Sequence, residues 1–436
     1  MSKVLKYSCL WLLAVALFWP TTTRAQDSTK NCLKLDVNFL SRGELRYGGL
    51  PEVGDETDDH ARFAVGRTRL ILGYERPHLE ARITAQHSGV WGQSGSFNLY
   101  ETWIKLKADN GLFAQVGRQE LNYDDERILG RDDWTMVSNS HDALRLGYEG
   151  HGHKAHLVLA YNQRSDNMNG GSTYRTDDGT HPYKSMVTAW YHYDLSRVPL
   201  GFSLLFMNLG AQNQQEEDPK TEFQQLLGAY VQYHPTRWNL EASYYRQMGT
   251  DEFHIPIKAW MMSLKADFEP SSRWCLTGGY DFLSGDENPV IPEIGAFGLT
   301  YHDTVRGFST LYGSHHQFYG AMYFFYIQGY YAGYTPGLQN LYFGATYKPL
   351  ERLNFNATYH YMRTASKISD ATPSLGHELE LSAGYTIIKD VKLSAGYTYM
   401  HGTSTLERLQ RIEGKNKLHW GWLMLTVNPN IFTKRW

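Results

Sequence analysis

The chain has 436 residues, of which 42% are hydrophobic, 14% aromatic and 20% charged, with 31 Tyr, 40 Gly and 15 Pro. This composition excludes a bundle of membrane helices, a coiled coil, a collagen-like fibre and a disordered chain. Many Tyr and Gly residues with few Pro favour a protein of many strands joined by turns.

Residues 1–25 are predicted to be a secretory signal peptide. Lys3 and Lys6 form its basic end, residues 10–18 its apolar stretch, and residues 23–25 a cleavage site. The apolar stretch is shorter than the ~20 residues that a membrane helix needs. Removing the segment leaves 39 basic and 45 acidic residues, a formal net charge of −6. This mild acidity argues against a nucleic-acid partner.

Residues 26–32 are predicted to be a short periplasmic lead-in, and residues 33–436 a single domain, because no linker or low-complexity stretch divides them. Two cysteines remain after the signal peptide, Cys32 and Cys275. A disulfide between them is conceivable in an oxidising compartment, but two free thiols are the simpler interpretation.

Alternation with a period of two residues dominates the chain after residue 33. Leu70 and Leu72 share one face of a predicted strand, whereas Arg67 and Arg69 share the other. The same pattern recurs at residues 79–86, 154–162, 239–244, 354–361 and 378–385. Because side chains alternate across a strand, each segment has one apolar and one polar face.

The connections between these segments also alternate, between short and long. Short turns are predicted at residues 76–78, 108–112, 150–153, 195–200, 234–237, 269–273, 349–352 and 388–390. Long loops are predicted at residues 48–61, 89–98, 122–141, 163–184, 210–221, 248–256, 284–339, 364–376 and 402–416. This layout predicts 18 strands.

An even strand number, with short periplasmic turns and long extracellular loops, is typical of an all-β, antiparallel transmembrane β-barrel in the outer membrane. A closed barrel satisfies every backbone group in lipid. Tyr and Trp residues near strand ends and the terminal Trp436 agree with this interpretation. A secreted β-sandwich or propeller is the alternative.

Several stretches resemble the alginate-export family of outer-membrane barrels. The first is residues 116–127, VGRQELNYDDER, followed by Gly130, Trp134 and the run DALRL at residues 142–146. Residues 280–286 are also similar, and residues 311–320 and 337–340 resemble the form found in Bacteroidetes members. The resemblance implies a monomeric 18-stranded barrel whose arginine-rich lumen lets an anionic polysaccharide leave the cell.

Charged residues on the polar faces predict the lining of a pore. The predicted substrate pathway comprises Arg67, Arg69, Arg82, Glu101, Arg118, Asp142 and Arg145. Guanidinium groups stay charged and bind carboxylate or phosphate in a forked geometry, so such a wall would attract uronate-like or other anionic solutes. In the alternative interpretation, these arginines pair with carboxylates on neighbouring strands and stiffen the barrel wall.

The connection at residues 284–339 is the longest and is unusually aromatic. Long loops of this kind are often functional, and we expect it to fold inward as a constriction or plug. The residues predicted at the narrow point are Tyr312, His315, His316, Gln317, Phe318 and Tyr319. The alternative is that residues 318–326 form strand-like structure packed on the rim or on a partner.

No metal, cofactor or catalytic site is expected. Acidic residues at 55–59 and 124–133 lack a repeated ligand spacing, so they are interpreted as surface carboxylates that face water rather than as calcium ligands. No serine lies in a nucleophile-elbow pattern and no carboxylate pair stands out, so the protein is not expected to be an enzyme.

The sequence therefore predicts a passive outer-membrane channel for anionic organic solutes or polysaccharide. Its expected partners are outer-membrane lipid and anionic oligosaccharides, polysaccharides or other small anions, with no nucleic acid. The alternative is a non-conducting or plugged barrel that serves as a scaffold, or as a glycan- or protein-binding subunit of an outer-membrane complex.

Overall fold

The structure, a computed structural model, describes residues 31–47, 60–162, 183–213, 220–286, 303–322, 336–368, 371–410 and 416–436. The predicted signal peptide lies outside the described residues, as do residues 26–30 of the predicted lead-in and the acidic residues 55–59.

Strands make up almost all of the described chain. In order they are β1 (Cys32–Tyr47), β2 (His60–Arg76), β3 (Leu79–Val90), β4 (Ser96–Lys107), β5 (Leu112–Gln119), β6 (His141–Gly150), β7 (His153–Tyr161), β8 (Ser185–Asp194), β9 (Leu200–Gln212), β10 (Thr221–Tyr233), β11 (Trp238–Thr250), β12 (Pro256–Ser271), β13 (Trp274–Leu283), β14 (Leu338–Leu350), β15 (Leu353–Arg363), β16 (Ser374–Ile388), β17 (Val391–Gly402), β18 (Lys417–Val427) and β19 (Asn430–Arg435).

Two short helices complete the described elements, η3 (His315–Gln317) and α2 (Ser404–Gln410). In the part of the chain that the structure describes, no helix is long and apolar enough to cross a membrane. Cys32 and Cys275 are both free.

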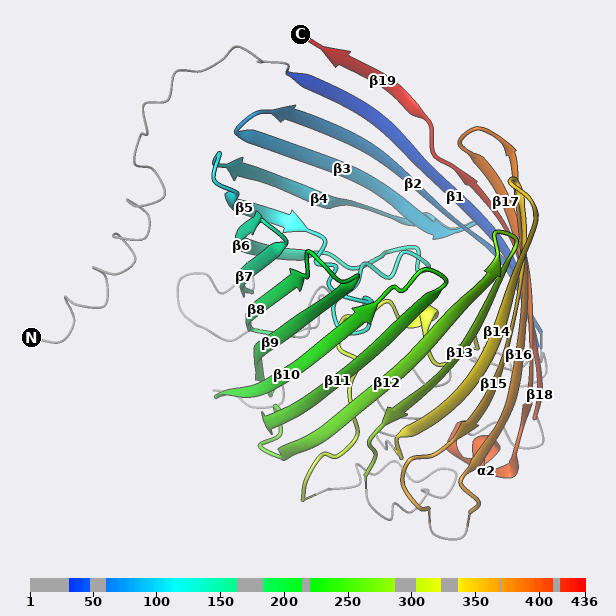
Figure 1. Cartoon of the computed structure of the whole chain (residues 1–436). Coiled ribbons are helices and arrows are strands. Elements are labelled where there is room, and N and C mark those ends of the chain that lie inside the picture. The colour runs from blue at the N-terminus through cyan, green and yellow to red at the C-terminus, as the bar shows by residue number, and fades with distance from the viewer. Residues whose placement is uncertain are drawn as a thin grey trace, which may run out of the picture.

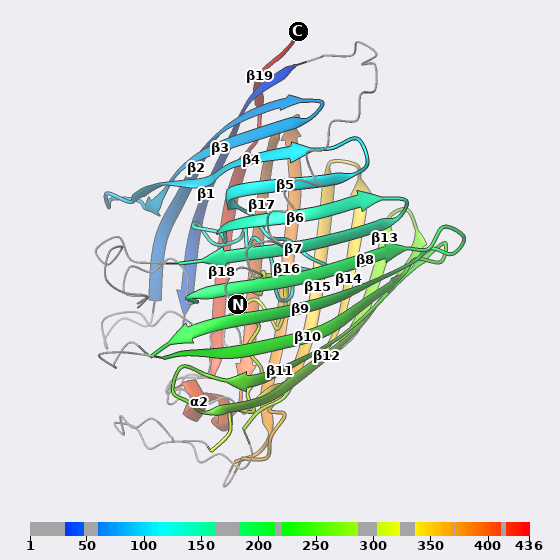
Figure 2. The same cartoon turned by 90° about the vertical axis from the view of Figure 1, so that its left-hand side faces the viewer.

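The strands form one closed antiparallel barrel, in which each strand pairs with its sequence neighbours and β1 closes the ring (Figures 1 and 2). The final segments β18 and β19 both pair with β1, in succession along its length. They are one strand interrupted at Pro429, which has no N–H to donate to the ladder. The prediction of 18 strands is therefore confirmed, and the last strand runs from Lys417 to Arg435.

Alternation along the strands separates a membrane face from a lumen face. Leu70 is 49% exposed and Ile83 is 45% exposed on the outside of the barrel. Arg67 is only 1% exposed and Gln86 is fully buried, because both point inward. An apolar outer face and a polar inner face are what a barrel in lipid requires.

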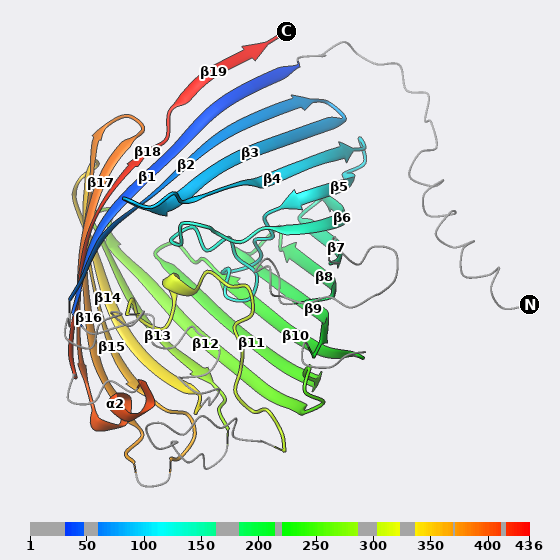
Figure 3. The same ribbon diagram turned by 180° about the vertical axis from the view of Figure 1, so that it is seen from behind.

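The hydrophobic core lies inside the barrel, toward the end that carries the long loops. Figure 3 shows the chain between β5 and β6 and the segment that contains η3 inside the ring of strands. Leu129, Phe308 and Leu406 are buried there against inward-facing wall residues. The lumen is therefore filled by packed side chains at its extracellular end.

Candidate functional site

Two inward loops, residues 120–140 between β5 and β6 and residues 303–322 between β13 and β14, meet inside the lumen; we call them the inner loops. Leu129 and Tyr312 form a parallel β-bridge. The Tyr312 N–H donates to the Ile128 carbonyl at 3.0 Å, and the Gly130 N–H donates to the Tyr312 carbonyl at 2.9 Å. The inner loops are therefore held together by backbone pairing of the kind that joins strands.

A second set of hydrogen bonds centres on Ser314. Its N–H donates to the Glu126 carbonyl at 2.8 Å, and its hydroxyl donates to the Glu126 carboxylate at 2.7 Å. The same hydroxyl accepts the Asp132 N–H at 2.9 Å. One serine thus satisfies buried polar groups at two points of the neighbouring loop.

Arg127 joins both inner loops to the barrel wall. Its guanidinium lies 3.1 Å from the carboxylates of Asp125 and of Asp281 on β13, and it donates to Tyr319 and Ser263 at 2.9 Å. Burial alone would lower the pKa of Arg127, but Tyr319 and the two carboxylates outweigh it and raise the pKa well above its usual value. The guanidinium is fully desolvated and fully paired.

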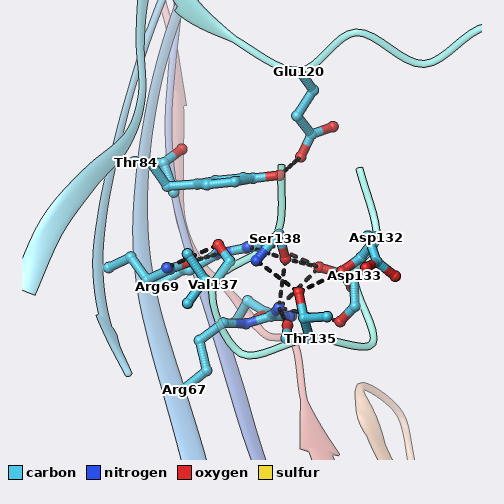
Figure 4. A network of polar contacts seen from close by, with 12 residues as sticks. Arg67, Arg69, Thr84, Glu120, Asp132, Asp133, Thr135, Val137 and Ser138 are labelled. Atoms are coloured by element: carbon cyan, nitrogen blue, oxygen red, sulfur yellow. Dashed lines mark hydrogen bonds and ion pairs between the residues drawn. The ribbon is translucent and has the colours of Figure 1, made fainter. Parts of the chain in front are cut away.

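Arg67 and Arg69 on β2 hold the 120–140 loop from the opposite wall (Figure 4). Each guanidinium lies 3.0 Å from an Asp133 oxygen, and both donate to the Ser138 hydroxyl. Burial would raise the pKa of Asp133, but the two arginines outweigh it and lower the pKa. These arginines face the lumen, where residues 133–138 of the loop cover them.

The acidic residues of this loop do not all face water. Asp132 is 7% exposed, and burial raises its pKa to about 6. Asp125 and Asp133 form the ion pairs just described. The interpretation of residues 124–133 as surface carboxylates is therefore wrong for Asp125 and Asp132, because the loop folds inward. Asp133 keeps 40% of its side chain exposed but pairs with two wall arginines. Among the described residues, no cluster of three His, Cys, Asp or Glu could hold a metal ion.

The predicted narrow-point residues lie in the second inner loop. His316 stacks on Trp134 of the first loop, with ring centroids 3.8 Å apart. Burial lowers the pKa of His315 to about 4 and that of His316 to about 3. Gln317 closes helix η3, Phe318 lies under the Arg127 guanidinium at 4.0 Å, and Tyr319 is 2% exposed.

The wall that receives the inner loops is lined with methionine. Five inward-facing methionines, each 0% exposed, lie near the extracellular ends of their strands: Met186, Met207, Met261, Met362 and Met400. Methionine adapts its shape to irregular surfaces. At Gly320, with a φ of +87°, a side chain would meet Met362 at 2.5 Å and Glu378 at 2.8 Å, so only glycine fits this approach.

Glu378 of β16 fixes the end of the second inner loop. The carboxylate accepts the Ala321 N–H at 2.6 Å and is 1% exposed. The adjacent inward-facing Glu380 lies 3.3 Å from His360. Glu378, Arg127 and the methionines were not predicted from the sequence, because polar inward faces were assigned to the pore and apolar inward residues had no assigned role.

Three further basic residues lie lower on the β3–β6 wall, Arg82, Lys105 and Arg145, which we call the basic stripe. Arg82 is 42% exposed and lies 3.2 Å from Glu101. A β-bulge between β3 and β4 turns both Tyr100 and Glu101 inward. Arg145 donates to Gln115 at 2.7 Å, and Lys105 lies over the Phe113 ring at 4.0 Å.

Arg118 and Asp142 do not belong to this lumen wall, so their predicted place in the substrate pathway is wrong. They pair directly across β5 and β6, and Val116, on the same face as Arg118, is 57% exposed. Their forked ion pair, 2.6 Å and 3.0 Å, therefore lies on the outside of the barrel. Asp142 and Arg145 are three residues apart, so they lie on opposite faces of one strand.

A sequence profile of the alginate export family matches residues 93–375, well over half of the chain. The protein belongs to the alginate export family. Several solved barrels share its fold. Pseudomonas aeruginosa OpdO has a TM-score of 0.62 at 13% identity, covering 92% of this chain and 98% of that chain. Pseudomonas aeruginosa OccK2 (OpdF) in complex with glucuronate has a TM-score of 0.61 at 13% identity, covering 92% and 97%.

Acinetobacter baumannii OccAB1 has a TM-score of 0.59 at 10% identity, covering 92% of this chain and 97% of that chain. A comparison with curated protein sequences gave no match. The family and the fold are those of outer-membrane channels rather than enzymes, and the outer membrane is the location of this alginate export barrel.

Below the inner loops, this family member has a polar cavity of about 450 Å³ against the β10–β16 wall. Its lining includes Tyr230, Asn340 and Tyr342 together with the carboxylates of Glu241 and Glu380. The acidic and amide-rich wall therefore lies across the lumen from the basic stripe. A solute in the periplasmic half would meet the basic stripe on one wall and, on the other, amides, hydroxyls and ion-paired charges such as Lys265 with Glu241.

Proposed function

We propose that this outer-membrane channel passes anionic organic solutes along the basic stripe. The observation that carries the proposal is the placement of Arg82, Lys105 and Arg145 on β3, β4 and β6 of one lumen wall, with a partly exposed guanidinium at Arg82. Cations aligned along a low-dielectric wall raise the local concentration of anions.

The chemistry of the stripe suits a carboxylate on a hydroxyl-rich body. Guanidinium groups bind carboxylates in a forked geometry, and the amides and hydroxyls of the facing cavity can bind sugar hydroxyls. A uronic acid or a polyuronate has both features. The likeness in fold to OccK2, solved with glucuronate, supports glucuronate as the first probe.

A second candidate function is a barrel that does not conduct and instead serves as a scaffold or binding subunit. The packed extracellular half of the lumen favours it, because the inner loops bury Leu121, Ile128 and Leu129 against the wall methionines. A packed core of this kind differs from the water-filled interior of a general porin.

Single-channel recording in a planar bilayer tests both candidates. We expect steady openings that favour Cl⁻ over K⁺ in a salt gradient and brief current blocks on addition of glucuronate. Replacing the stripe (Arg82→Gln, Lys105→Gln, Arg145→Gln) should remove most of the anion preference, whereas Arg273→Gln in a periplasmic turn should not. An unchanged preference in the triple variant would overturn the stripe as the pathway. A wild-type barrel that never conducts would favour the second candidate.

A further inference from the structure

The membrane face of β11 and β12 carries two adjacent cations near its extracellular end. Arg246 shares the outward face of β11 with Leu240 and Tyr244, which are 38% and 46% exposed. Lys258 is on the outward face of β12, and Arg246 pairs with Trp260, two residues further along. The cations are therefore diagonal neighbours, ~7–8 Å apart at their Cα atoms.

Neither cation has an acidic partner among the described residues. Both side chains are exposed, and no hydrogen bond or ion pair joins either side chain to the described protein. Among the described acids at this end of the neighbouring strands, Asp251 accepts two backbone N–H groups and Glu222 of β10 lies 3.0 Å from His254. Two like charges side by side cost stability unless something anionic lies between them.

The position of Arg246 and Lys258 along the membrane normal places both cations at the extracellular boundary of the membrane. Trp238 and Phe268 form an aromatic pair at the periplasmic end of the same strands, with centroids 4.5 Å apart. Arg246 lies eight residues beyond Trp238. At about 3.3 Å per residue and a tilt of about 40°, this is ~20 Å along the membrane normal, near the top of an apolar band of ~25 Å.

An aromatic cluster lies beside Arg246 and on the periplasmic side of Lys258. Trp260 stacks on Phe282 at 4.5 Å, and Tyr244 lies 6.0 Å from Trp260. Aromatic rings of this kind mark the level where lipid headgroups begin. A charged ligand at this site would therefore have acyl chains below it.

Positive charge also predominates on the rest of the outward face of the described strands. Arg62, Arg363 and Lys417 are also on outward faces near the extracellular ends of their strands. On the described strands, Asp142 is the one outward-facing carboxylate, and it is already paired with Arg118. The face that contacts the outer leaflet is thus cationic and complementary to phosphate.

We propose that Arg246 and Lys258 bind a phosphate group of a phosphorylated glycolipid in the outer leaflet, with Trp260 against its sugar or the start of an acyl chain. Arginine supplies a fork and lysine a point charge, a combination that suits phosphate oxygens. The site commits to a lipid rather than a free anion because it lies at the membrane boundary and is flanked by exposed apolar side chains.

Native mass spectrometry of the purified barrel in detergent tests the proposal, with bisphosphorylated lipid A and its dephosphorylated form as probes. We expect Arg246→Gln combined with Lys258→Gln to weaken binding of the bisphosphorylated lipid by about tenfold or more. The matched control, Arg273→Gln with Lys348→Gln at the periplasmic end, should bind as the wild type does.

Three outcomes would overturn the proposal: equal binding by the double variant, equal binding of the dephosphorylated lipid, or displacement of the lipid by millimolar inorganic phosphate, which would identify a free-anion site. The altered side chains point outward and away from the inner loops, so the variant should form the folded barrel, as checked by its heat-dependent mobility on a gel. Ion selectivity should not change, which separates this test from that of the lumen.

Discussion

The periplasmic half of the lumen has a polar lining and the extracellular half a packed apolar one, although the same strands form both. Toward the periplasm, inward faces carry Arg82, Glu241 and Lys265, and a cavity of about 450 Å³ remains between the walls. Toward the extracellular side, inward faces carry Met186, Met207 and other apolar residues that exclude water. One half is thus a polar passage and the other a small protein core.

The difference shows how two loops can fill one half of a barrel with a packed core without a separate plug domain. The inner loops carry their own apolar side chains and bury them against the wall, so that burial stabilises them as in a soluble core. Their polar groups are satisfied by specific wall residues, Arg67 and Arg69 on one side and Glu378 on the other. Substitutions that weaken these contacts should release the inner loops and make the extracellular half of the lumen accessible to water, as the periplasmic half is.

The largest effect is expected for Arg127→Met, which leaves Asp281 and Asp125 without their shared cation. Breaking a buried ion pair by removing one partner costs about 3–5 kcal/mol. The inner loops should detach, with higher single-channel conductance and rapid protease cleavage within residues 120–140. Adding Asp281→Asn should restore part of the protection, and Arg131→Gln, an exposed position on the same loop, should change neither readout. Wild-type conductance in the Arg127 variant would refute a packed upper half.

A smaller effect is expected for Asp133→Asn. The carboxylate is 40% exposed, so its loss costs less than that of a fully buried partner, about 1.5–3 kcal/mol. Hydrogen exchange should become faster at residues 133–138 while residues 303–322 stay protected. The control is Asp109→Asn, in an exposed periplasmic turn. Equal acceleration in both inner loops would mean that they open as one unit.

The sequence predicted the barrel well because its fold depends on local patterns. Alternation, turn length and strand number follow from short-range rules, and 18 strands is the observed number. The candidate site was harder to predict. Arg118 was placed in the lumen because it is charged, although Val116 beside it on the same face is clearly outward.

The sequence could not predict that the 120–140 loop covers Arg67 and Arg69, because this arrangement depends on contacts between residues far apart in the sequence. Asp133 meets Arg67 across 66 positions of sequence. A signal for the packed upper half was nevertheless present. Residues 204–207 and 259–262 are apolar on both faces, which is unexpected for a strand beside water. Inward-facing apolar residues at strand ends therefore indicate where a loop enters the lumen.

The smallest effect expected is a pH-dependent loosening of the second inner loop. His315 and His316 have pKa values of about 4 and about 3 in the closed loop, against 6.5 for an ordinary histidine, because burial disfavours their charged forms. The opened loop binds more protons below pH 6.5, so closure weakens as the pH falls from 6.5 toward 4. Asp132 opposes this, since its pKa of about 6 favours the closed state as it takes up a proton below pH 6.

Two histidines outweigh one carboxylate, so protection of the Tyr312 and Ser314 amides from hydrogen exchange should fall between pH 7 and pH 5. At pH 5 each histidine contributes at most about 2 kcal/mol, and Asp132 offsets about 1.4 kcal/mol. His316→Phe keeps the stack on Trp134 but cannot titrate, so it should lose about three quarters of the net pH response, because Asp132 still offsets most of what His315 contributes. His401→Phe, outward on β17, should lose none. If the His316 variant kept the full response, the titrating group would have to lie outside the stack that joins the two inner loops.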